Sequence, residues 1–108
     1  MRQPKWHRWE VLLLVNSYFK VKDKGIDWQK ECARLSDLLR RYGANEDPDY
    51  RNETGIRMKY LNIKYLDDGQ GLSGYSMLDK EIFELYKNNY NLYLAELKMV
   101  NDLLSKIK

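Results

Sequence analysis

The stretch Tyr50–Leu66, YRNETGIRMKYLNIKYL, has apolar residues at helical spacing and decides what the rest of the chain must provide. On a helix that turns by about 100° per residue, its apolar side chains form two arcs, one of Met58, Leu61 and Tyr65 and the other of Ile56, Tyr60 and Ile63. A helix with two apolar arcs buries both only between neighbours on two sides. We therefore expect a helix over residues 54–66 that packs inside a helical bundle.

The residues before this stretch predict two further helices. Apolar residues recur at helical spacing over residues 9–22, and Gly25 ends that segment. A second helix begins after an N-cap at Asp27 and stops at Gly43, which is well placed as the residue just past its end. Both helices have enough apolar residues to pack against the helix over 54–66.

The residues after this stretch predict two more helices, separated from it by glycine-rich turns. Ser76 is a good N-cap, and Asp79 three residues on forms a weak capping box. We expect one all-α domain over residues 1–108, a small bundle of about five helices without strands. Its three-helix core, over about 9–66, resembles a helix-turn-helix fold with a longer loop before the third helix, and a C-terminal helical segment covers 76–108.

Length and composition limit the class of protein. A chain of 108 residues, 44% hydrophobic and 32% charged, fits one domain with one modest core. No apolar run approaches the roughly 18 residues of a membrane-spanning helix. The single cysteine, Cys32, cannot form an internal disulfide, and no cleavable signal pattern is present. We expect a bacterial, cytoplasmic protein that has no membrane contact.

Positive charge gathers in two parts of the chain. Residues 1–25 carry a net charge of +4 and residues 55–66 carry +3, whereas residues 45–54 carry −3. The expected helix over 54–66 has three cations and no acid, which is typical of a helix that faces a polyanion such as DNA. An ordinary solvated surface explains the same charges, and the sequence leaves both interpretations open.

Four polar side chains of this helix emerge between its two apolar arcs. Arg57 and Lys64 lie in one gap, and Lys59 and Asn62 lie in the other. Arginine and lysine there could reach phosphates, and Asn62 or Arg57 could reach base edges in a major groove. All four could equally be plain surface residues.

The sequence offers no catalytic constellation. His7 lies among aromatic residues near the start, without a second histidine or an acidic partner at metal-ligand spacing. Cys32 lies on the apolar stripe of its helix, with no histidine to activate the thiol. We expect no enzyme activity, no metal and no cofactor.

Four segments together resemble a known family: WHRWEVLLLVNSYFK, ECARLSDLLRRYG, YRNETGIRMKYLNIKYLD and GLSGYSMLDKEIFELY. They are similar to the N-terminal helical, helix-turn-helix-like region of bacterial HNH-type endonucleases and related defence proteins. The likeness covers roughly residues 6–86, and its most specific part is the string RN-G-MK-N. Its motif positions are Arg51, Asn52, Gly55, Met58, Lys59 and Asn62.

The resemblance implies a DNA-recognition module whose catalytic nuclease domain is separate. A lone His7 cannot build an HNH metal site, so the resemblance does not extend to cleavage. We expect double-stranded DNA, unmodified or base-modified, as the partner. The residues expected to bind it are Arg51, Asn52, Arg57, Lys59, Asn62 and Lys64.

The C-terminal third supports an alternative function. From Phe83 onward, apolar residues alternate at spacings of three and four, the seam of a heptad pattern. The interface residues that this seam predicts are Tyr86, Tyr90, Tyr93, Leu97, Val100, Leu104 and Ile107. Such a helix either joins a partner, for instance in a homodimer, or packs back on its own bundle. Leu92, Met99 and Leu103 widen the stripe beyond a two-stranded seam.

Overall fold

The computed structural model describes residues 5–43 and 47–106, and these residues form five α-helices without strands. The helices are α1 (Arg8–Lys24), α2 (Trp28–Gly43), α3 (Glu53–Asp68), α4 (Met77–Asn88) and α5 (Tyr90–Lys106). The predicted all-α fold is confirmed. Within the described ranges, no helix combines the length and the apolar character that crossing a membrane requires.

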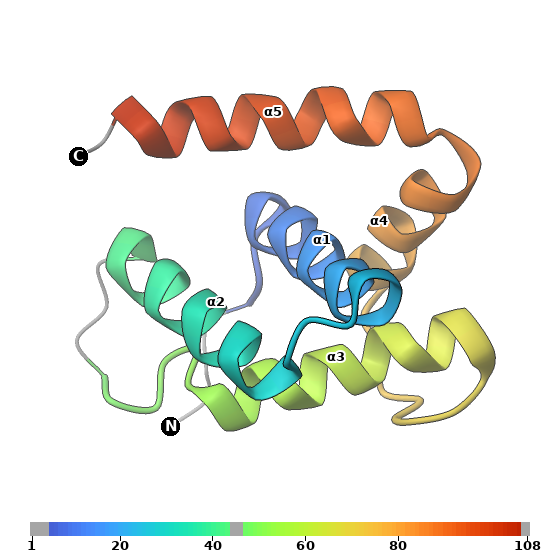
Figure 1. Ribbon diagram of the computed structural model, residues 1–108, viewed down its shortest axis with the longest axis horizontal. Coiled ribbons are helices and arrows are strands. Elements are labelled where there is room, and N and C mark those ends of the chain that lie inside the picture. The colour runs from blue at the N-terminus through green and yellow to red at the C-terminus, as the bar shows by residue number, and fades with distance from the viewer. Residues whose placement is uncertain (1–4, 44–46, 107–108) are drawn as a thin grey trace.

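Helix α1 is the centre of the bundle. Figure 1 shows α2, α3, α4 and α5 arranged around it, and α1 contacts each of them. Five consecutive residues, Val11–Val15, are all buried, because neighbours cover every side of this helix. The run VLLLV is therefore the inner axis of the fold, since a helix that is apolar all round belongs in a core.

Helices α1, α2 and α3 contact one another in all three pairs, which confirms the predicted three-helix core. The arc of α3 formed by Ile56, Tyr60 and Ile63 is buried in it. The other arc is not: Met58 and Tyr65 are exposed, and Tyr65 stacks on Tyr75 from the following loop. The expectation that both arcs are buried was wrong, because a loop takes the place of a helix on that side.

Local capping explains where α3 and α4 begin and end. The Asn52 side chain accepts a hydrogen bond from the Gly55 backbone N–H at 2.8 Å, which fixes the start of α3. Gly69 then adopts a left-handed conformation with φ of 78° and ends that helix. Ser76 and Asp79 form the predicted capping box at the start of α4.

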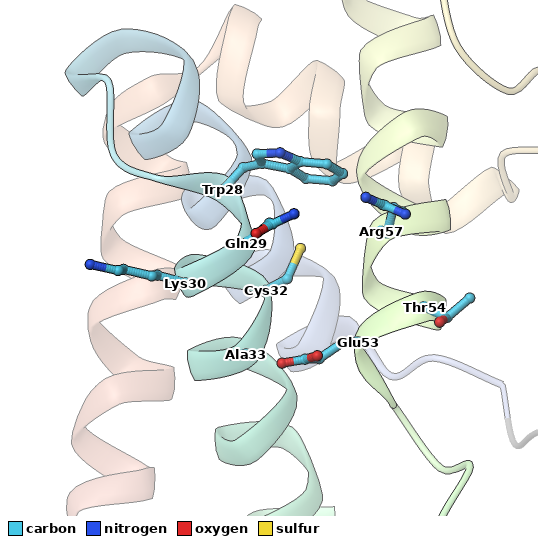
Figure 2. A pocket seen from close by; sticks show the side chains of 8 residues that line it. All are labelled: Trp28, Gln29, Lys30, Cys32, Ala33, Glu53, Thr54 and Arg57. Atoms are coloured by element: carbon cyan, nitrogen blue, oxygen red, sulfur yellow. The ribbon is translucent and has the colours of Figure 1, made fainter.

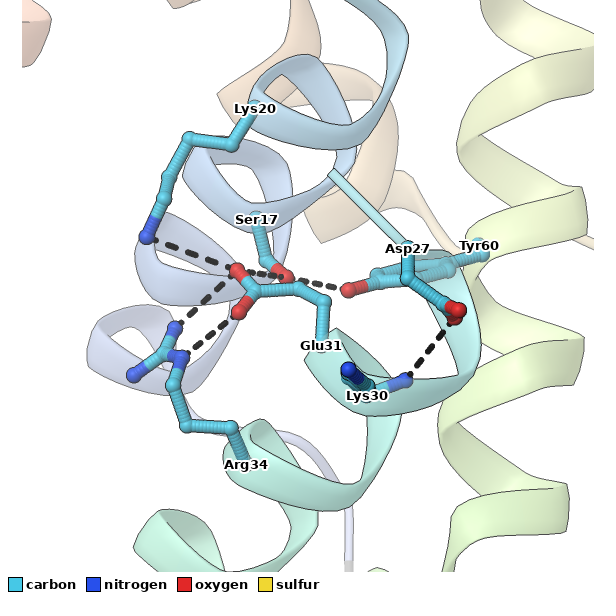
Figure 3. Close-up of polar contacts among 7 residues, drawn as sticks. All are labelled: Ser17, Lys20, Asp27, Lys30, Glu31, Arg34 and Tyr60. Atoms are coloured by element: carbon cyan, nitrogen blue, oxygen red, sulfur yellow. Dashed lines mark hydrogen bonds and ion pairs between the residues drawn. The ribbon is translucent and has the colours of Figure 1, made fainter. Parts of the chain in front are cut away.

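A buried polar network ties the three core helices together (Figure 3). The Glu31 carboxylate of α2 accepts a hydrogen bond at 2.8 Å from Ser17 of α1, whose hydroxyl also bonds to the hydroxyl of Tyr60 on α3. Burial raises the pKa of Glu31, but the Arg34 guanidinium at 2.6 Å and Ser17 outweigh it, so the pKa lies below its ordinary value. Glu31 is therefore a charged anchor inside the bundle.

Candidate functional site

The charge of α3 differs from the sequence expectation, because the helix is longer than predicted. It begins at Glu53 and continues through Asp67 and Asp68. These residues add three acids to a helix with three cations, so α3 as folded carries no net charge. The expectation of a cationic helix without acids was therefore wrong for α3. What each cation can contact depends on its position in the fold.

Arg51 is buried inside the bundle and is only 3% exposed. Its guanidinium makes two hydrogen bonds to the Glu10 carboxylate, at 2.8 and 2.9 Å, and Glu10 itself is fully buried. The rings of Trp6 and Tyr50 each lie 4.6 Å from the guanidinium carbon. Arg51 thus joins the loop before α3 to α1, and its predicted role as a phosphate contact does not fit this position.

Lys59 is also held by an acid. Its ammonium lies 2.7 and 2.9 Å from the two carboxylate oxygens of Asp79, a fully buried residue of α4. The centre of the Trp6 ring lies 5.2 Å from the same ammonium, so this indole contacts both Lys59 and Arg51. Lys59 therefore connects α3 to α4 instead of extending toward a polyanion.

The two asparagines of the expected DNA-binding set have structural positions. Asn52 caps α3, as described above, and Asn62 is buried with 8% of its surface exposed. Three of the six expected residues, Arg51, Asn52 and Lys59, thus make contacts within the fold, and a fourth, Asn62, is buried. The structure does not bring the six together as one open patch.

Arg57 and Lys64 are the two cations of α3 that face solvent. They are seven residues apart and share one face of the helix with Glu53 and Asp68. Lys64 pairs with Asp68, whereas no carboxylate in the described part of the chain lies within ion-pair distance of Arg57. Instead, the guanidinium carbon of Arg57 lies 4.6 Å from the centre of the Trp28 ring.

Arg57 borders a cavity of about 510 Å³ between α2 and α3, which we call the α2–α3 groove. Its lining residues, drawn in Figure 2, are Trp28, Gln29, Lys30, Cys32, Ala33, Glu53, Thr54 and Arg57. A second cavity of about 450 Å³ shares three of these residues and extends along α2 to Arg40. The first cavity has the size of a small-molecule site. Of its lining residues, only Arg57 was expected to be functional. The sequence feature that could have indicated Glu53 is its position four residues before an arginine.

Cys32 forms part of the inner wall of this groove. Its side chain is buried, and burial raises the pKa of the thiol to about 11. The nearby Arg57 lowers this pKa and Glu53 raises it, so both charged side chains lie close to the Cys32 thiol. Within residues 5–43 and 47–106, no three side chains of histidine, cysteine, aspartate or glutamate gather as a metal site.

The heptad seam of α5 packs largely on its own chain. Tyr93, Leu97 and Val100 are buried, and the Tyr93 hydroxyl donates a 2.6 Å hydrogen bond to the Leu12 carbonyl of α1. Of the other predicted interface residues, Tyr86 and Leu104 are partly buried, Tyr90 is exposed, and Ile107 lies outside the described residues. The centre of the seam is thus part of the monomer core and is not free to join a partner.

A different face of α5 is apolar and open to solvent. Five of the ten exposed large hydrophobic side chains in the described ranges lie on this one helix, and Leu92, Met99 and Leu103 among them share one face of it. We define the α5 stripe as Leu92, Ala95, Met99 and Leu103, which share a face at helical spacing. Beside Leu103, a cavity of about 220 Å³ is lined by Trp9, Tyr42, Val100, Leu103 and Leu104.

No family model, curated protein or solved structure matches this chain. Function is therefore inferred from the α5 stripe and the α2–α3 groove themselves. The stripe was visible in the sequence as the widening of the heptad seam by Leu92, Met99 and Leu103. The groove was not, because it depends on how α2 and α3 lie beside each other.

Proposed function

We propose that this chain is a non-catalytic interaction module that pairs with a second copy of itself through the α5 stripe. The observation that carries the proposal is the exposure of its large side chains: 48% for Leu92, 64% for Met99 and 60% for Leu103. Leaving three such side chains in water costs free energy that a helix from another molecule would recover. The cavity beside Leu103 extends the same apolar surface toward Trp9 and Tyr42.

A second copy fits the stripe because the stripe is self-complementary. In an antiparallel pair related by a two-fold axis, Leu92 of one copy lies opposite Leu103 of the other. The same register places each Met99 near the small Ala95 of the other helix, so that large side chains meet small ones at the centre. Leu92 then reaches the edge of the cavity lined by Trp9 and Tyr42. This arrangement matches the knobs and holes by which helices pack.

The charges beside the stripe also suit a copy of the same chain. Lys98 pairs with Asp102 within α5, at 3.1 Å. Arg8 pairs with Glu96 at 2.8 Å and with Glu81 at 3.0 Å. The flanks are therefore close to neutral, and two identical faces meet without strong repulsion.

Sedimentation equilibrium at several concentrations tests the proposal. We expect a reversible shift from the 13.0 kDa monomer toward twice that mass, in the micromolar range expected of a small interface. Met99→Glu is expected to keep the protein monomeric at every concentration. A wild-type chain that stays monomeric at millimolar concentration would contradict the proposal.

Asn101→Glu is the matched control, because it adds the same charge to α5 on a face away from the stripe. We expect it to self-associate like the wild type. If both variants reduce the average mass equally, general charge repulsion explains the effect and the α5 stripe does not. Circular dichroism spectra of all three proteins verify that the helices are intact.

DNA binding by a cytoplasmic bacterial defence protein is the second candidate function. What supports it is Arg57, exposed and without a carboxylate partner in the described residues, and the resemblance of the RN-G-MK-N string. Paired DNA half-sites would require a dimer that sets two copies of α3 side by side. In Figure 1, α3 and α5 lie on opposite sides of α1, so pairing through α5 does not do this.

Titration of labelled duplex DNA, unmodified and base-modified, tests this second function at two salt concentrations. Two phosphate contacts, from Arg57 and Lys64, predict a slope of roughly −1.8 for log affinity against log salt. The double variant Arg57→Gln/Lys64→Gln is expected to lose the salt-dependent binding. Binding that does not respond to salt, or that the double variant retains, speaks against DNA as the partner.

A further inference from the structure

We propose that the α2–α3 groove binds a small zwitterion of the amino-carboxylate class, and that this site is independent of self-association through α5. Three charged side chains line the groove, and two of them, on the same helix, have opposite charge and are not paired with each other. These are Arg57 and Glu53, both on α3. Their separation along the helix sets the distance between the two charges of the ligand, and the neutral wall between them favours an apolar middle part.

Arg57 provides the end of the site that receives an anion. Its guanidinium carbon lies 4.6 Å from the centre of the Trp28 ring, a cation–π contact that limits the orientations of the side chain. A planar guanidinium of this kind binds a carboxylate through two parallel hydrogen bonds. Because no protein carboxylate within the described ranges occupies this edge, a ligand carboxylate can take it.

Glu53 provides the opposite end. A glutamate four residues before an arginine is the spacing at which helical ion pairs normally form, yet these two side chains do not pair. Arg57 instead lies over the Trp28 ring. In Figure 2 the side chains of Glu53 and Arg57 both extend from α3 toward α2, with the Cys32 sulfur on the facing wall.

These charges exclude the simpler ligands. An anion bound to Arg57 is repelled by Glu53, and a cation bound to Glu53 is repelled by Arg57. Lys30 does not change this balance, because Figure 2 shows its side chain directed away from α3. A molecule with a carboxylate at one end and an ammonium at the other satisfies both residues. Its methylene groups would lie along the neutral wall of Cys32 and Ala33.

Two-dimensional ¹H–¹⁵N NMR of the full chain tests the site, with the Trp28 indole N–H as the reporter. The probes are glycine, β-alanine, 4-aminobutyrate, 5-aminovalerate and 6-aminohexanoate, which vary the distance between the two charges. The signal is assigned with Trp28→Phe. We expect one length to shift the Trp28 signal most strongly and saturably, while the Trp9 signal beside the α5 stripe stays in place.

Variants separate the two halves of the site. Arg57→Gln and Glu53→Gln are each expected to weaken binding of the best probe by about tenfold or more, since each removes a charge-assisted contact. Lys64→Gln, an exposed change on the same face of α3, is expected to have no effect. The N-acetylated probe is expected to bind as weakly to wild type as the parent probe does to Glu53→Gln. The proposal is overturned if no probe shifts the Trp28 signal, or if the N-acetylated probe binds as well as its parent.

Discussion

Replacing Arg51 with alanine is expected to lower the free energy of unfolding by about 3–5 kcal/mol, the usual effect of removing one member of a buried ion pair. Glu10 is fully buried and would lose both hydrogen bonds from the guanidinium. Trp6 and Tyr50 would each lose a cation–π contact with the guanidinium. Urea unfolding at neutral pH, followed by circular dichroism, measures the change.

Two further substitutions separate the causes of this loss. Arg51 has a φ of 48°, a conformation that costs alanine energy but glycine almost none. Arg51→Gly is therefore expected to be about 1 kcal/mol more stable than Arg51→Ala, although both lack the ion pair. Arg57→Ala removes an exposed arginine and is expected to cost less than about 1 kcal/mol. An Arg51→Ala protein as stable as Arg57→Ala would show that the buried pair contributes little.

Leu97→Glu is expected to leave the protein largely unfolded, although the sequence predicted Leu97 as an interface residue. Leu97 is 8% exposed, so the substitution removes buried apolar contacts and adds an unpaired carboxylate to the core. Together these changes are expected to cost more than about 4 kcal/mol. Small domains have a total stability of about 5–15 kcal/mol, and thermal melting reports the loss directly.

Leu103→Glu introduces the same charge six residues further along α5 and is expected to behave differently. Because this side chain is already in solvent, we expect the melting temperature to stay within a few degrees of wild type and only self-association to be lost. Equal destabilisation by Leu97→Glu and Leu103→Glu would mean that the two faces of α5 are not distinct. The pair of variants thus separates core from interaction surface on one helix.

Features that depend on neighbouring residues could be predicted from the sequence. Capping at Asp27 and Ser76 and the helical spacing of apolar residues gave the first three helices, and the start of α4, to within two residues. The net charge of α3 could not be predicted in the same way. An error of one residue at its start and two at its end omitted Glu53, Asp67 and Asp68, and with them all of its acids.

Contacts between distant residues explain the remaining differences. Arg51 lies 41 residues from Glu10 in the sequence, and Lys59 lies 20 from Asp79, so counting charges by segment treated all four as free. The string RN-G-MK-N, which carries the family resemblance, consists in this fold largely of a buried ion pair, a helix cap and a link between α3 and α4. Residues that look like a binding motif in the sequence can thus be the ones that hold the bundle together.

The placement of α3 and α5 on opposite sides of α1 has a consequence for any assembled form (Figure 1). Two chains joined along α5 would present their α2–α3 grooves outward, far from the two-fold axis. Such an assembly could not close both grooves around one compact molecule. It would act as a bivalent cross-linker, and it would gain avidity only from targets displayed at two separated points, such as the ends of a long polymer or two sites on a crowded surface.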